Sequence, residues 1–78
     1  MFNYQVTFLY GGNEHSLVFQ SSANPEGTPD EIFKGIANEA VAKWIQDNGR
    51  VAGAFPTRII LSVFDSNRRV GAWDNFRE

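Results

Sequence analysis

Residues 28–49, TPDEIFKGIANEAVAKWIQDNG, carry the pattern that decides the fold. Apolar side chains recur here at intervals of three and four, which places them on one side of an amphipathic helix. The members of this stripe are Ile32, Phe33, Ile36, Ala37, Ala40, Val41, Trp44 and Ile45. The sequence therefore predicts a helix over residues 29–47 that lays one apolar face on a core.

Both ends of this helix carry terminus signals. Thr28 and Glu31 have the spacing of a capping box, in which each side chain accepts a hydrogen bond from the backbone N–H of the other. Pro29 stands at the first helical position, where its missing N–H has no helical partner to lose. At the other end, Asn48 and Gly49 predict a C-cap.

Upstream of the helix, residues 1–20 predict a β-hairpin. Residues 2–10, FNYQVTFLY, alternate with period two, and Phe2, Tyr4, Val6, Phe8 and Tyr10 share one face. The GGNE stretch at residues 11–14 has turn chemistry, because glycine and asparagine tolerate a positive φ. A second strand is expected over residues 15–20.

Downstream, residues 50–57 form a linker whose Pro56 resists joining a strand ladder. Strands are predicted at residues 58–64 and 69–74, with a turn at 65–68 and a short tail after them. The layout is ββαββ. The economical arrangement is a single α+β domain over residues 1–78, with a four-stranded antiparallel sheet and one helix packed on one face.

Composition excludes several classes of protein. The 78 residues are 42% apolar, 21% charged and 14% aromatic, which is typical of a globular chain and not of a disordered one. The absence of cysteine excludes disulfides, thiolate zinc sites and a cysteine nucleophile. No apolar run approaches the roughly 20 residues of a membrane span. With no basic stretch at its start, the chain is expected to be soluble and cytoplasmic.

Catalytic motifs are missing from the sequence. His15 is the one imidazole, and its place after a turn predicts an exposed side chain without a structural role. Gly11 and Gly12 lead to a strand and not to a helix N-terminus, so they do not form a phosphate-binding loop. We therefore expect no catalytic residues, no metal site and no cofactor, and a protein that is not an enzyme.

Charge is distributed unevenly along the chain. Residues 1–48 hold two lysines and six carboxylates, a balance of −4, whereas residues 49–78 hold five arginines and three carboxylates, a balance of +2. Such asymmetry favours interaction surfaces. The candidate partner-binding residues are Glu31 and Glu39 with Lys34 and Asn38 on the helix, and Arg58, Arg68, Arg69, Trp73 and Phe76 near the C-terminus.

The C-terminal set rests on strand alternation. Period two predicts that Arg69 points with Gly71 and Trp73, where arginine and indole can form a cation–π contact. Trp73 can equally close the end of the core, and Phe76 can dock a partner or plug the fold. Arginine and tryptophan are enriched at the energetic centres of protein interfaces, so a protein partner is expected.

Two other functions stay open. Phe2, Tyr4, Phe8 and Tyr10 have the alternate spacing with which a sheet stacks single-stranded nucleic acid, and the arginines could meet phosphates. The negative net charge argues against it, and so does the expectation that these aromatics lie under the helix. The third hypothesis is a structural accessory domain that self-associates through an edge strand.

The layout resembles that of a known class of proteins. ANEAVAKW (residues 37–44), set between YQVTFLY and RIILSVF, resembles the organisation of small phage-encoded inhibitors, among them anti-CRISPR proteins. The resemblance implies a protein that occupies a surface on a larger host complex. The leading hypothesis is a non-enzymatic protein-binding domain of this kind, a phage or mobile-element inhibitor that blocks a host complex such as a CRISPR effector.

Overall fold

The computed structural model describes residues 1–76. It contains the predicted elements in the predicted order, ββαββ, and its α+β class is confirmed. The bounds of β1 are as predicted, and the other strands and the helix differ from their predicted bounds by one or two residues at an end. The elements are β1 Phe2–Tyr10, β2 Asn13–Ser21, α1 Asp30–Asn48, β3 Thr57–Asp65 and β4 Arg68–Asp74.

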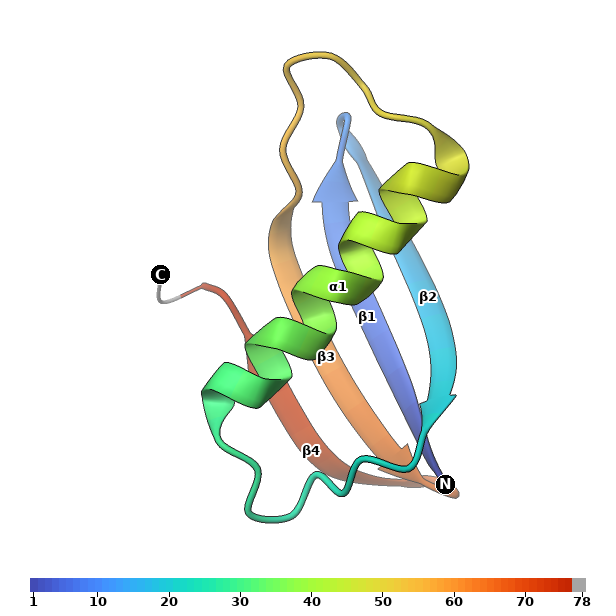
Figure 1. The fold of residues 1–78 in the computed structure, drawn as a ribbon, viewed down its shortest axis with the longest axis vertical. Coiled ribbons are helices and arrows are strands. Elements are labelled where there is room, and N and C mark those ends of the chain that lie inside the picture. Colours follow the sequence, from blue (N-terminus) through green and yellow to red (C-terminus); the bar gives the residue numbers. More distant parts are fainter. Residues whose placement is uncertain (77–78) are drawn as a thin grey trace.

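All strand pairs are antiparallel, and the strand order across the sheet is β2-β1-β3-β4 (Figure 1). The first strand of the chain therefore lies inside the sheet, between β2 and β3. β1 and β2 pair without a register shift, from Phe2 opposite Ser21 to Tyr10 opposite Asn13. Gly11 and Gly12, with φ of 63° and 83°, form the two-residue turn that fixes this register.

Two bulges interrupt the other pairings. Opposite Phe8, β3 has one residue more than β1, and Arg58 at this point has a φ of 51°. A bulge of this kind usually has glycine in the left-handed conformation. The second bulge lies in β4, where Val70 is the extra residue: Gly71 pairs with Val63 of β3, but Arg69 pairs with Phe64 of β3. Each bulge reverses the alternation of side chains that follows it.

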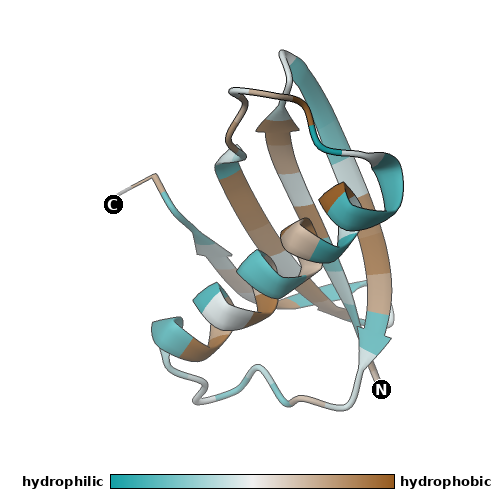
Figure 2. Cartoon of the chain, turned by 45° about the horizontal axis from the view of Figure 1, so that its top comes forward, coloured by the Kyte–Doolittle hydropathy of each residue, from teal (hydrophilic) through white to brown (hydrophobic). Residues whose placement is uncertain are grey.

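α1 crosses one face of the sheet diagonally (Figure 1). Its N-terminal part lies over β3 and β4, and its C-terminal part over the start of β2. The core between helix and sheet is formed by side chains that α1 and the two central strands turn toward each other, and brown apolar bands of the sheet lie beneath the helix in Figure 2. The buried apolar residues are Tyr4, Val6, Phe8, Tyr10, Phe33, Ala37, Val41, Ile45, Ile59, Leu61 and Val63.

The ends of α1 confirm one prediction and correct another. Gly49 has a φ of 96°, and its N–H donates to the Ile45 carbonyl at 2.8 Å, as a C-cap requires. The predicted capping box is wrong. Pro29 is the N-cap in an extended conformation, so Thr28 lies outside the helix, and its hydroxyl donates to the Asn24 carbonyl.

The apolar stripe of the helix is also narrower than its spacing predicts. Phe33 and Ala37 are buried, but Ile32 is 53% exposed. The first turn of α1 lies near the edge of the sheet, so a residue turned away from Phe33 has nothing beneath it. The helix has no apolar stretch long enough to cross a membrane, within residues 1–76.

Candidate protein-binding surfaces

The candidate binding residues near the C-terminus do not form one surface, because the structure places them at two ends of the sheet. Arg58 and Phe76 line one pocket of about 490 Å³ together with Thr57 and Asn75. Arg68 begins β4 at the opposite end, where it pairs with Asp65. Arg58 and Asp65 are seven positions apart along β3, which corresponds to about 23 Å. One compact partner site cannot use all of these side chains together.

Arg69 and Trp73 lie on opposite faces of the sheet, so the prediction that they share a face is wrong. Trp73 pairs with Leu61 on the helix side, and Arg69 pairs with Phe64 on the open side. The cause is the bulge at Val70, which reverses the alternation between the two residues. Trp73 is half-buried and packs against the core, whereas Phe76 is 57% exposed.

The helix residues proposed for binding also point in different directions. Glu31 is exposed in the first turn of α1. Asn38 lines a groove between α1 and the start of β3, and Glu39 lines a second groove between α1 and β2. Successive residues of a helix are about 100° apart, which explains why these neighbours face different grooves.

The aromatic side chains of β1 are core residues. Tyr4 is fully buried, Phe8 is 1% exposed and Tyr10 is 4% exposed. The Tyr4 hydroxyl donates to the Ala23 carbonyl at 2.6 Å, and burial raises the pKa of this phenol above its ordinary value of 10.0. Phe2 is half-buried and packs against this core. The three buried rings are therefore not free to stack nucleic-acid bases, and nucleic-acid binding through other side chains stays a prediction.

The prediction that His15 is exposed and has no structural role is wrong. Its ring is half-buried and lies 4.3 Å from the Trp44 ring, between centroids. Its Nε2–H donates to the Tyr10 carbonyl at 3.2 Å, which assigns the proton to that nitrogen. Phe8 packs edge-on against Trp44 at 5.3 Å. This aromatic group joins the C-terminal half of α1 to the start of β2.

Below this aromatic group, α1 and β2 diverge and leave a groove that we call the β2 groove. Its volume is about 680 Å³, within the range of pockets that bind small ligands. Half-buried apolar side chains line it, and charged side chains of the helix stand among them. The apolar residues are Leu17, Phe19, Ile36, Ala40 and Trp44, and the charged ones are Glu39, Lys43 and Asp47.

The outer edge of β2 runs beside this groove. Asn75 N–H donates to the Ile59 carbonyl at 3.1 Å, so Ile59 directs its backbone groups toward β4. Alternate residues of a strand direct these groups to opposite sides. We followed this alternation from β3 to β1 and from β1 to β2 through their registers. Four residues of β2 direct their N–H and C=O groups outward, away from β1: Glu14, Ser16, Val18 and Gln20.

β2 has few of the features that protect an edge strand from pairing, and its only charged side chain is that of Glu14 at its start. It is nine residues long, pairs with β1 without a bulge and contains no proline, lysine or arginine. Such features are the usual means by which proteins prevent the addition of a further strand. β4, the other edge, is seven residues long and has a bulge and two arginines. Sequence reasoning missed this difference, although the composition of residues 13–21 contained it.

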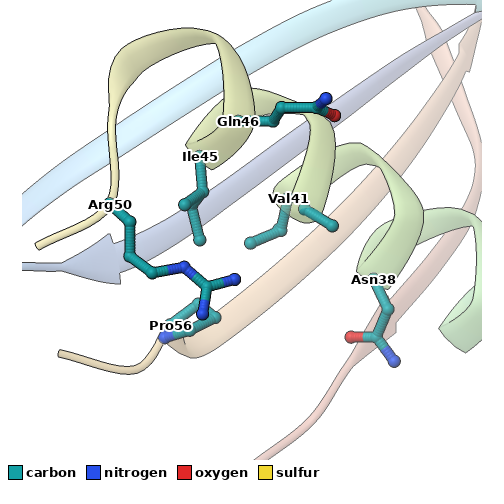
Figure 3. Close-up of a pocket in the computed structure, with 7 residues that line it drawn as sticks. Asn38, Val41, Ile45, Gln46, Arg50 and Pro56 are labelled. Carbon is teal, nitrogen blue, oxygen red and sulfur yellow. The ribbon is translucent and has the colours of Figure 1, made fainter. Parts of the chain in front are cut away.

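A further groove lies on the other side of the helix, between α1 and Pro56 (Figure 3). Val41 and Ile45 form its apolar floor, and the Arg50 side chain extends along it toward Pro56. Its volume is about 590 Å³. This groove borders no strand edge, so its shape alone suits a compact side chain and not an extended chain.

Within residues 1–76, no group of three or more histidine, cysteine, aspartate or glutamate side chains is arranged to hold a metal ion. Comparison with protein-family models, curated proteins and solved structures finds no match.

Proposed function

We propose that this protein is a non-enzymatic protein-binding domain that receives an extended segment of its partner along the edge of β2. The observation that carries the proposal is an unprotected nine-residue edge beside an apolar groove. An added strand gains main-chain hydrogen bonds from the edge, and its alternate side chains enter the groove. Both requirements of this recognition mode therefore meet at one place.

The side chains around β2 support this assignment. Leu17 and Phe19 are half-buried on the helix side and pack against the core from its margin. Val18 is 66% exposed on the open side. A strand placed next to β2 would cover apolar surface on both faces, which adds hydrophobic stabilisation to the main-chain hydrogen bonds.

The layout resemblance to phage-encoded inhibitors is compatible with this site. An inhibitor that blocks a host complex must occupy a surface that the complex needs. An edge strand does so by capturing an extended segment of the target, without any chemistry of its own. We propose this inhibitor role as well, with the edge of β2 as the surface through which the protein would act.

The test uses one proline substitution on each edge of the sheet. Val18→Pro removes an N–H that points outward, so it blocks strand addition and leaves the β1–β2 ladder intact. Ala72→Pro is the matched control, because Ala72 alternates with two β4 residues that face β3 and so directs its N–H to the other edge. A displayed library of random linear peptides is selected on the unmodified protein.

We expect the selected peptides to bind Ala72→Pro as tightly as the unmodified protein and to lose most of their affinity for Val18→Pro. Binding should also slow hydrogen exchange at the amides of Ser16, Val18 and Gln20. Circular dichroism and thermal melting check that both variants are folded. Full affinity for Val18→Pro, or a library that yields no binder, would overturn the proposal.

A further inference from the structure

The charges around the β2 groove indicate which extended segment it receives. This inference rests on the proposed function and concerns the chemistry of the partner. Glu39, Lys43 and Asp47 stand in the wall that α1 contributes to the groove. Glu14 lies at the start of β2, at the end that the contact between His15 and Trp44 joins to α1. These four residues carry a balance of −2.

The surrounding surface has the same sign. Residues 1–48, which include β1, β2 and α1, carry a balance of −4, and all five arginines follow them in the sequence. Arg58 is the second residue of β3 and Arg68 begins β4, on the far side of β1 from β2. Arg50 follows α1, but its side chain lies in the groove on the other side of the helix, beside Pro56. A segment that approaches the β2 groove therefore meets a negative field with little compensation from nearby arginines.

The groove also limits the side chains that can face the helix. Successive side chains of a strand point to opposite faces, so every second residue of an added strand lies toward α1. Leu17, Phe19 and Ile36 offer apolar surface to these residues. On the open face, the added strand lies beside Ser16, Val18 and Gln20, which are exposed and mostly polar. The added strand therefore needs apolar side chains at alternate positions, which are those that face α1.

We propose that the β2 groove binds a basic extended peptide, with apolar side chains at alternate positions and lysine or arginine at the two ends, which lie beside Asp47 and Glu39. The apolar side chains cover Leu17 and Phe19, and the basic side chains pair with Asp47 and Glu39. Each exposed ion pair strengthens binding by roughly twofold to fivefold. A second copy of this chain fits less well, because its β2 would bring a further Glu14, Glu39 and Asp47 to the same place.

The test uses three synthetic peptides with a fluorescent label. The first is Val-Thr-Val-Thr-Val with a pair of lysines at each end. The second has glutamates in place of the lysines, and the third keeps the composition of the first but places its valines together. We expect the lysine peptide to bind about tenfold more tightly than the glutamate peptide, with the difference decreasing as salt is added. The third peptide should bind more weakly than the first.

Two double variants, each of which removes two negative charges, test which carboxylates cause the preference for lysine. Glu39→Gln with Asp47→Asn should remove most of the preference for lysine. Glu26→Gln with Glu31→Gln is the control, since it changes the net charge equally but lies outside the groove, and it should keep the preference. Equal binding of the lysine and glutamate peptides, or an equal loss in both double variants, would overturn the inference.

The outcomes also separate this inference from the proposed function. If both peptides bind equally and Val18→Pro abolishes both interactions, strand addition holds and the basic partner is wrong. If binding persists in Val18→Pro, the proposed site itself is wrong. If no peptide binds and the protein forms a dimer that Val18→Pro dissociates, the occupant is a second copy, and the inference of a basic peptide fails.

Discussion

Pro25 packs directly over the backbone of Gly71. A Cβ atom added to Gly71 would lie 2.9 Å from the Pro25 Cβ and 3.4 Å from the Phe33 ring. Pro25 is buried, so the loop before α1 is fixed against β4 at this point. The contact holds the N-terminal end of the helix over the sheet, and the absence of a side chain at residue 71 makes it possible.

Gly71→Ala should therefore lower the free energy of unfolding, by about 1–3 kcal/mol, because the added methyl group must displace Pro25 or Phe33. Urea denaturation measures the change. Gly35→Ala is the matched control: nothing lies within 4 Å of a Cβ at this exposed position of α1, and alanine favours the helix by about 1 kcal/mol over glycine. Loss of stability in both variants would contradict the argument from the Pro25 contact.

Arg58 is strained by its positive φ of 51° at the β3 bulge. Arg58→Gly should raise the free energy of unfolding by about 1 kcal/mol, because glycine adopts this conformation without a Cβ clash. Arg58→Ala keeps the Cβ and should bring no such gain. Thermal melting of the two variants distinguishes backbone strain from the loss of the side chain. A gain in Arg58→Ala equal to that in Arg58→Gly would assign the effect to the charge.

Tyr4 makes stability depend on pH in the alkaline range. Burial raises the pKa of its phenol above 10.0, so above this pH the unfolded chain loses the proton before the folded protein does. The stabilisation is complete below pH 10.0 and is lost as the pH rises through the folded-state pKa. Urea denaturation from neutral to alkaline pH should show this decline, and Tyr4→Phe should reduce it.

The same Tyr4→Phe variant should be less stable at neutral pH by about 1–2 kcal/mol, because the Ala23 carbonyl loses its donor. Two independent readouts therefore follow from one substitution. An unchanged alkaline decline in the variant would show that other groups cause it.

Trp44 should contribute far more to stability than Ile32, although both belong to the apolar stripe of the helix. Trp44 contacts the rings of Phe8, Tyr10 and His15, so Trp44→Ala should lower the free energy of unfolding by about 3 kcal/mol. Ile32 is 53% exposed, and Ile32→Ala should change it by less than about 0.5 kcal/mol. Chemical denaturation of the two variants measures both losses of stability. Equal losses would contradict the prediction.

Local patterns were sufficient to predict the elements of this fold. The period of two in residues 2–10 and the helical spacing from Ile32 to Ile45 depend only on neighbouring residues, and both gave the correct type of structure. Gly49 ended the helix as predicted, because its conformational freedom is a local property. Bounds were less accurate, since they depend on which residues find a partner in the sheet.

The candidate site was less predictable because it depends on how distant elements meet. The bulge at Val70 separates Arg69 from Trp73, and only the pairing of β4 with β3 reveals it. The contact between His15 and Trp44 requires the diagonal course of α1 over the sheet. The β2 groove arises from the same course, because a helix aligned with β2 would have covered Leu17 and Phe19.

The position of β1 between β2 and β3 has a consequence for synthesis on the ribosome. Asn3 pairs with Phe64, so β1 is made before β2, α1 and its second neighbour β3. A lone hairpin is marginally stable in water. Until β3 has been made, Tyr4 and Phe8 have no strand on the second side of β1, and the nascent chain must keep this apolar strand soluble.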